Sequence, residues 1–200
     1  MYEEQMDPGA VRAKRKNDPA ALRARVLDTA FNLFQAQGYN ATGVQEIAAA
    51  AGVTGGALHH HFPSKKSLGL AVIRERVAQA VEETWIDPIL RGRTSRAAIG
   101  GVFAKLANEL DRNGAVRGCP VNNLTLELAF AEPDFRSELR AVFDRWRQTL
   151  ATKLGEDGRN DADRLATMVI ASYSGAMAIA KVEQRGEPLR QCAEELDRLL

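Results

Sequence analysis

The chain of 200 residues has only two cysteines, Cys119 and Cys192, and they lie far apart in the sequence. This spacing excludes a disulfide framework and a zinc-binding motif, and it agrees with a reducing compartment. The first residues lack the apolar segment of a signal peptide, and no uninterrupted apolar run approaches the roughly 18 residues of a membrane span. We therefore expect a cytoplasmic protein that does not bind a membrane.

Further absences narrow the class of protein. The three histidines are consecutive and none lies near Cys119 in the sequence, so the usual pairing of a nucleophile with a base is missing. We expect neither catalysis nor a cofactor. The formal net charge is only +1, whereas a non-specific DNA-packaging protein is basic throughout. No strand-like alternation of apolar and polar residues occurs, which predicts an all-α fold.

The small net charge hides an uneven distribution along the chain. Between residues 9 and 66, eight basic residues face three acidic ones, so the rest of the chain is net acidic. A basic head on a mildly acidic body is typical of a protein that contacts nucleic acid at one end. Residues 1–19 lack a periodic apolar pattern, and we expect a flexible basic arm there. Its Arg12 and Lys14 either reach a minor groove or DNA phosphates, or belong to a solvated tail.

The segment 42–66 predicts two short helices joined by a tight glycine turn. Thr42 and Gln45 have the spacing of a capping box, which places the start of the first helix there. Gly52 predicts a left-handed end of that helix, and Thr54 predicts the N-cap of the second. Such a pair is a helix-turn-helix, which lays its second helix in the major groove of DNA.

A basic helix start follows this pair. Pro63 ends the second helix, and Ser64 opens the next one with Lys65 and Lys66 in its first turn. Lysines in a first turn oppose the helix dipole. We expect a group outside the chain to compensate, and a DNA phosphate would do so. The alternative is two solvated lysines.

The run TGVQEIAAAAGVTGGALHHHFPSKKSL resembles the DNA-binding segment of the TetR family of bacterial transcriptional regulators. The likeness covers the Ile-Ala-x-x-Ala-Gly-Val core, the Leu-x-x-His-Phe segment and the Ser-Lys helix start, and a helix over residues 21–37 is similar to the family's first helix. The resemblance implies an all-α fold of about nine helices. Residues 20–64 would form the DNA-binding domain, and residues 65–200 the effector-binding and dimerisation domain. It also implies a ligand-responsive regulator, most often a repressor of a palindromic operator.

The predicted recognition helix departs from the family pattern. His59 and His60 stand where relatives often carry tyrosine or other large residues, and Gly55 and Gly56 offer no side chain where relatives often read bases. We expect Ala57 to meet a thymine methyl group and the two histidines to meet phosphates. Neighbouring helix residues point about 100° apart, so the histidines cannot converge on a metal ion. The predicted DNA-binding residues are Arg12, Lys14, Thr42, Thr54, Gly55, Ala57, His59, His60 and Lys65.

Apolar spacing and turn residues predict six more helices. We expect the first to stop before Pro88, one to end near Asn113 and Gly114, and another to be capped by Asp134. They cover residues 65–86, about 99–113, 120 to about 131, 134–154, 161 to about 185, and 188–199.

Small side chains line the helix predicted over residues 161–185, in the segment ASYSGAMAIA. Small residues allow close helix packing, and in TetR-like proteins the last two helices usually form the dimer. The resemblance thus implies a homodimer through residues 161–185 and 188–199. The alternative is packing of this helix within its own domain. The inward stripe is predicted to comprise Leu165, Met168, Val169, Ile179 and Val182.

Aromatic and sulfur-containing side chains recur on the inward faces of these helices. The resemblance implies a small apolar or aromatic effector between them, anchored by a few polar groups such as Thr125; the alternative is an ordinary core. The predicted effector-binding or sensing residues are Trp85, Phe103, Cys119, Asn123, Trp146, Tyr173 and Met177, and Phe130 and Met168 are also expected to face inward.

Cys119 precedes the proline that begins the helix at residue 120. The helix N-terminus and nearby Arg117 would both favour a thiolate there. The Gly-Cys-Pro segment before Asn-Leu-x-x-Glu-Leu is similar to one found in a TetR subgroup, some members of which respond to reactive electrophiles. The sequence therefore raises the hypothesis of a thiol sensor, with a small buried cysteine as the alternative.

Overall fold

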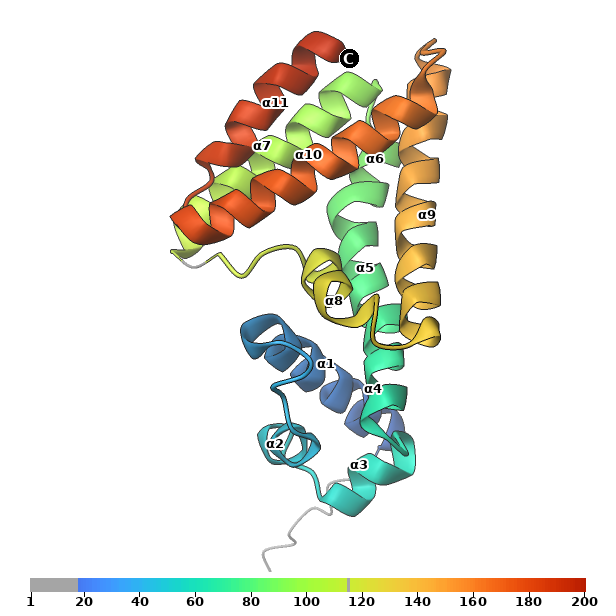
Figure 1. Ribbon diagram of the computed structural model, residues 1–200, viewed down its shortest axis with the longest axis vertical. Helices are drawn as coiled ribbons and strands as arrows, with labels where there is room; N and C mark the ends of the chain where they lie inside the picture. Colours follow the sequence, from blue (N-terminus) through green and yellow to red (C-terminus); the bar gives the residue numbers. More distant parts are fainter. Residues whose placement is uncertain (1–17, 115) are drawn as a thin grey trace, which may run out of the picture.

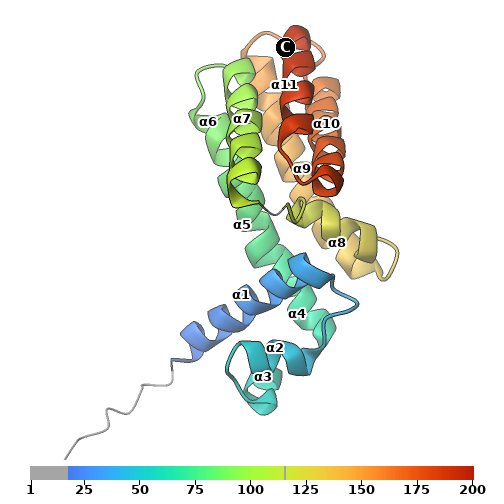
Figure 2. The same cartoon turned by 90° about the vertical axis from the view of Figure 1, so that its left-hand side faces the viewer.

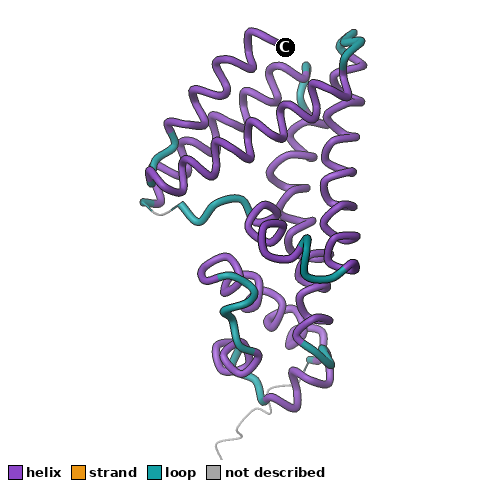
Figure 3. Tube along the Cα trace, in the orientation of Figure 1, coloured by secondary structure: helices purple, strands orange, loops and turns teal. Residues whose placement is uncertain are grey.

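The computed structural model describes residues 18–114 and 116–200, and this part of the chain is helical without a strand (Figures 1 and 3). Arg12 and Lys14 lie outside the described residues. The helices are α1 (Pro19–Gln37), α2 (Val44–Ala50), α3 (Gly55–His61), α4 (Lys65–Val72), α5 (Ala78–Val81), α6 (Asp87–Arg91), α7 (Ser95–Asn113), α8 (Pro120–Leu128), α9 (Pro133–Glu156), α10 (Ala162–Glu183) and α11 (Glu187–Leu199).

One continuous helical run spans residues 65–91. It consists of α4, α5 and α6, joined by the π-helical turns η1 (Ile73–Val77) and η2 (Glu82–Ile86). If this run is counted as one helix, the described chain has the nine helices that the sequence predicted. The predicted stop before Pro88 is wrong. The Asp87 N–H bonds the Glu82 carbonyl across a widened turn, and such a turn accommodates a proline that lacks an N–H for a regular α-helical ladder.

Local capping explains most of the other boundaries. The Asp18 carboxylate accepts hydrogen bonds from the N–H groups of Ala20 and Ala21 and so begins α1. Gly114 ends α7 in the left-handed conformation with a φ of 63°, as predicted. The predicted cap at Asp134 is wrong, because α9 begins one residue earlier and its N-cap is Glu132.

The helices form two groups along the long axis of the molecule. Helices α1 to α3 form a small head at one end, and α7, α10 and α11 pack together at the other (Figure 1). The 65–91 run connects the two groups, and α9 lies against both this run and α10. Figure 2 shows α8 lying between the head and the upper helices. Any signal between the groups therefore passes through the long run, α8 or the start of α9.

Helix α10 is long and apolar enough to resemble a membrane span, with a mean hydropathy of 1.5 in its most apolar window. It is the one helix of the described chain that passes this test. It packs against α9 and α11, however, and 44% of that window is buried in the chain itself. A core helix of a soluble protein meets the same criteria.

Candidate DNA-binding and effector sites

The turn between α2 and α3 has the geometry of a helix-turn-helix. Gly52 has a φ of 63°, and the Val53 N–H bonds the Ala48 carbonyl at 3.0 Å, which closes the end of α2. The Thr54 hydroxyl then accepts a hydrogen bond from the Ala57 N–H at 3.1 Å and caps α3 as predicted.

The two helices of this motif share a buried contact face and leave one face open. Ile47 of α2 and Leu58 of α3 are both buried, so the helices are held together by apolar packing. The opposite face of α3 is open, and it presents His59 and His60 to solvent. Gly55 and Ala57 are half-buried beside it. This open face is suited to enter a groove.

The prediction that Thr42 caps α2 is wrong. Its side chain is fully buried, donates to the Gly38 carbonyl at 2.6 Å and accepts from the Gln37 amide at 3.3 Å. The N-cap of α2 is Gly43, whose N–H donates to the Glu46 carboxylate at 3.4 Å. Thr42 therefore fastens α1 to the loop before α2, and its hydroxyl is not free to reach DNA.

The expectation for the two lysines at the start of α4 is wrong in part. Lys66 forms ion pairs with Glu132 and with Asp134, at 2.7 Å from the latter, and these hydrogen bonds raise the pKa of the lysine, that to Asp134 foremost. The chain itself thus compensates a charge that we assigned to an external anion. Lys65 donates to the Asn40 carbonyl at 3.2 Å and lies 4.5 Å from the centre of the Tyr39 ring.

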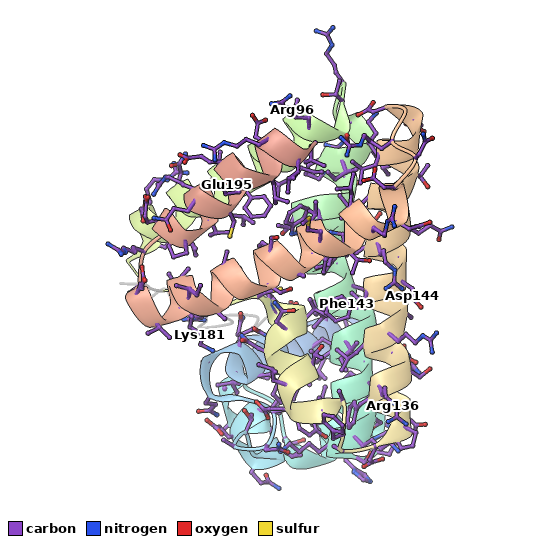
Figure 4. The ribbon with its side chains drawn as sticks, turned by 45° about the horizontal axis from the view of Figure 1, so that its top comes forward. Arg96, Arg136, Phe143, Asp144, Lys181 and Glu195 are labelled. Carbon is purple, nitrogen blue, oxygen red and sulfur yellow. The ribbon has the colours of Figure 1, made fainter. Side chains whose placement is uncertain are left out.

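Four predicted effector residues form one buried aromatic cluster. The Trp85 ring centre lies 4.9 Å from that of Tyr173, 5.0 Å from that of Trp146 and 5.6 Å from that of Phe103. Phe143 stacks on Trp146 at 6.2 Å and lies on the inner side of α9 (Figure 4). Met177 is also buried. The aromatic core therefore draws on η2, α7, α9 and α10.

Several side chains that we expected to face inward are exposed in the single chain. Phe130 is 97% exposed and Met168 is 42% exposed, because each projects from the outer side of its segment. On α10, Ile179 and Val182 are exposed as well, whereas Leu165 and Val169 are buried as predicted.

Cys119 joins the aromatic cluster through Tyr173. The thiol is buried at the N-cap of α8, and burial raises its pKa, although the nearby Asn122 N–H, Tyr173 hydroxyl and Val121 N–H act in the opposite direction. Burial also raises the pKa of Tyr173 well above its ordinary value, and its contact with Cys119 raises it further. The predicted stabilisation of a thiolate is therefore outweighed by desolvation, and both groups are neutral near pH 7.

Comparison with protein families follows the same division into head and body. Residues 26–72 match the family described as bacterial regulatory proteins, tetR family, and residues 95–195 match the C-terminal domain described as transcriptional regulator LmrA/YxaF-like. The chain belongs to the TetR family. TetR regulators bind DNA operators, typically act as dimers with small-molecule effectors, and are in general soluble and cytoplasmic.

Individual TetR regulators are similar over most of the chain. YxaF of Bacillus subtilis strain 168 is 29% identical over 184 residues, which cover 87% of this chain and 92% of YxaF. The repressor DhaR of Mycobacterium sp. strain GP1 is also 29% identical, with 85% and 87% covered. AcuR of Cereibacter sphaeroides is 32% identical over 164 residues, with 76% and 73% covered. A solved TetR regulator from Chloroflexus aurantiacus has a TM-score of 0.78 at 32% identity, with 90% and 94% covered.

Helix α8 attaches the body of this TetR regulator to its head. The Asn123 amide donates to the Gln35 side chain at 2.9 Å and to the Arg117 carbonyl at 2.9 Å. The Glu127 carboxylate accepts from the N–H groups of Tyr39 at 3.2 Å and Asn40 at 2.9 Å. Asn123, predicted as an effector anchor, is therefore engaged between the two domains. Sequence reasoning missed Glu127, because its partners lie almost 90 residues away and leave no local pattern.

A separate surface groove of about 550 Å³ runs between the 65–91 run and α9 in this TetR regulator. Its floor is apolar, and the ion pairs Arg74–Glu138 and Arg145–Glu82 stand at its walls. The groove residues do not include the aromatic cluster. Thr125, another predicted polar anchor, donates its hydroxyl to the Val121 carbonyl at 2.7 Å within α8.

Proposed function

We propose that this TetR regulator is a homodimeric repressor that leaves a palindromic operator when a small molecule or a reactive electrophile acts on its C-terminal domain. The observation that carries the proposal is the open face of α3, held on a buried helix-turn-helix core. DhaR, which is similar over most of the chain, is itself a transcriptional repressor.

The operator contacts are proposed on α3 and the residues around it. Thr54 and Ala57 stand at the start of α3, and His59 and His60 are exposed one turn later. Lys65 at the start of α4 adds a phosphate contact. Because Gly55 and Gly56 offer no side chain, part of the sequence preference rests on the fit to DNA shape.

The dimer is proposed to form through α10 and α11. Met168, Ile179 and Val182 form an exposed apolar stripe on α10, interleaved with the exposed small residues Ala171 and Gly175. A second copy would remove this stripe from water and approach the helix closely. Figure 4 shows α10 and α11 side by side, with Lys181 and Glu195 projecting from them. Two recognition helices would then stand about 34 Å apart, the repeat of one DNA turn.

Release is proposed as a shift between two positions of the head. The long run begins at the DNA with Lys65 and reaches the aromatic cluster at Trp85, so a ligand that favours one arrangement of the cluster acts on both ends. Helix α8 provides a second connection, from Cys119 beside the cluster to Glu127, which contacts Tyr39 and Asn40 of the head. A coupling of about 1–3 kcal/mol changes operator affinity roughly 5- to 150-fold.

Cys119 is proposed as the group that an electrophile modifies when the cluster opens, because in the closed cluster the thiol is buried and neutral. Conjugate addition of the thiol would form an S–C bond and pass the thiol hydrogen to the adduct, so no other reactant is needed. The added bulk would separate α8 from Tyr173 and loosen the head. If Cys119→Ser responds to electrophiles like the parent protein, this part of the proposal is wrong.

The main test is selection of bound DNA from random fragments with the full chain, followed by competition between selected and random DNA at fixed salt. We expect a palindrome and a dimer on it. A monomer without preference for any palindrome would overturn the proposal. Challenge of the selected complex with ligands then tests release separately from binding.

A further inference from the structure

Two hydrogen-bond donors in the aromatic cluster have no acceptor. The indole N–H groups of Trp85 and Trp146 are buried and unpaired, and the two side chains are 1% and 0% exposed. The Trp85 N–H lies near the Tyr173 hydroxyl, but not in the geometry of a hydrogen bond. Because a buried donor without an acceptor destabilises the folded chain, unpaired donors indicate a place where a ligand supplies the acceptor.

The surroundings of these donors carry no charge. Among the residues that the structure describes, the buried polar side chains are Gln35, Thr42 and Ser95, and no carboxylate or cationic group is buried. Tyr173 and Cys119 stay neutral, since burial raises the pKa of both groups. A charged ligand would therefore lose its hydration without gaining a counter-ion.

The two indoles add donors to the cluster but no acceptor. An indole N–H can only donate, so a bound molecule must supply the acceptor for each of them. The Tyr173 hydroxyl lies beside the Cys119 sulfur and can both donate and accept. The ring edges and faces around Trp85 favour flat apolar groups.

We propose that the effector is a neutral, largely apolar compound with a carbonyl acceptor, bound with that oxygen at the indole N–H groups of Trp85 and Trp146. The inference rests on the proposed function, because it names the ligand class of the same regulatory domain. Ketones, aldehydes and esters of about the size of one aromatic ring belong to this class, and carboxylates do not.

The position of Trp85 can couple ligand entry to movement of the head. Its ring packs tightly against three others, so the ligand enters by turning an indole aside. Trp85 lies in η2, where the i+5 turn holds one extra residue. Return of this turn to α-helical geometry would rotate the adjoining helix by about 100°. The same run begins at Lys65, so movement of the indole reaches the head.

The test compares carbonyl compounds with isosteres that have a methylene group in place of the oxygen. The probes are acetophenone against α-methylstyrene, and cyclohexanone against methylenecyclohexane, titrated into the full chain by calorimetry with thermal shift as a second readout. We expect the ketone of each pair to bind at least about tenfold more tightly, since the methylene group cannot accept from an indole. Equal affinities within both pairs, or no binding of either ketone, would overturn the inference.

Variants assign the effect to the two donors. Trp85→Phe and Trp146→Phe keep an aromatic ring and remove the N–H, and each should reduce the ketone preference to within about threefold. Phe143→Leu, next to Trp146 but without a donor, is the matched control and should keep the preference. Retention of the full preference in both tryptophan variants contradicts the inference. If one variant fails to fold by circular dichroism, the other and the isostere pairs decide.

An operator-binding measurement separates this inference from the proposed function. Ketone binding that depends on the indoles but leaves operator affinity unchanged supports the ligand class and contradicts ligand-induced release. Release by a compound that binds regardless of the indole N–H groups supports the proposed function and contradicts the ligand class.

Discussion

Glu127 of α8 holds the backbone of Asn40, 87 residues earlier in the chain, by a hydrogen bond of 2.9 Å from the Asn40 N–H. The other carboxylate oxygen accepts from the Tyr39 N–H at 3.2 Å. These N–H groups follow the end of α1, so one side chain of the body fixes the exit of the first helix of the head. The contact is a direct mechanical link between the proposed sensing and DNA-binding parts.

Removal of this link should uncouple the two parts. Glu127→Ala leaves two N–H groups without their acceptor, and we expect the free energy of unfolding to fall by about 1–3 kcal/mol. The effector-induced change in operator affinity should also shrink. Urea unfolding and operator titration with and without effector measure the two effects. Glu127→Gln, which retains one acceptor oxygen, should lie between the parent and the alanine variant; equal coupling in all three proteins would refute the link.

Gly38 should tolerate no side chain. Its φ is 90°, and a Cβ atom would clash with Oε1 of Glu127, so that this flexible side chain would have to move. Gly38→Ala should therefore lose about 1–3 kcal/mol of stability through backbone strain, with a further loss from the clash. In a double-mutant cycle with Glu127→Ala only the clash is relieved, so the two losses should be less than additive. Full additivity in urea unfolding would show that the clash is absent.

The Lys66 ion pairs should make the stability of the fold depend on pH in the acid range. The hydrogen bond and charge of Lys66 hold the pKa of Asp134 below its ordinary value of 3.8. A lowered carboxylate pKa stabilises the fold above the unfolded-state pKa, and this contribution is lost as pH falls through the folded-state pKa. Between about pH 5 and pH 2.5 the urea midpoint of the parent should thus fall more than that of Lys66→Met. Parallel midpoints across this range would contradict the prediction.

Operator affinity should fall when His59 and His60 are replaced together. Both side chains are exposed on the open face of α3, and their ring N–H groups would donate to DNA phosphates. The double variant His59→Ala/His60→Ala should therefore bind the operator more weakly at fixed salt and pH. His61, which is half-buried, offers the matched control His61→Ala. Equal affinity of the parent protein and the double variant would exclude phosphate contacts through the two imidazoles.

A charge in the exposed stripe of α10 should prevent dimerisation. Ile179 is 51% exposed, and Ile179→Arg would place a cation in the proposed interface. We expect the dimer dissociation constant from sedimentation equilibrium to rise at least about tenfold, with a parallel loss of operator binding. Leu90→Arg is the control, since Leu90 is 61% exposed on α6, away from α10. Equal dimerisation of both variants would place the interface elsewhere.

Turn and cap residues predicted the DNA-binding motif well. The same kind of signal failed where another group binds the side chain that was expected to cap a helix. Gly52, Thr54 and Ser64 act on groups within a few residues, so their roles as turn or cap were readable and are confirmed. Thr42 has the spacing of a cap, yet its hydroxyl donates to the Gly38 carbonyl at the end of α1 and does not cap α2.

The sequence by itself determined the helix-turn-helix, the sequence of helices and the family, because these depend on residue types at short, regular spacings. Only the tertiary structure decided that Glu127 accepts hydrogen bonds from the head, that Lys66 pairs with carboxylates at the start of α9, and that the Cys119 thiol is neutral. Each of these depends on groups that are tens of residues apart and on burial from water. No local pattern records which distant atoms meet, since packing of the whole chain sets those distances and the local dielectric.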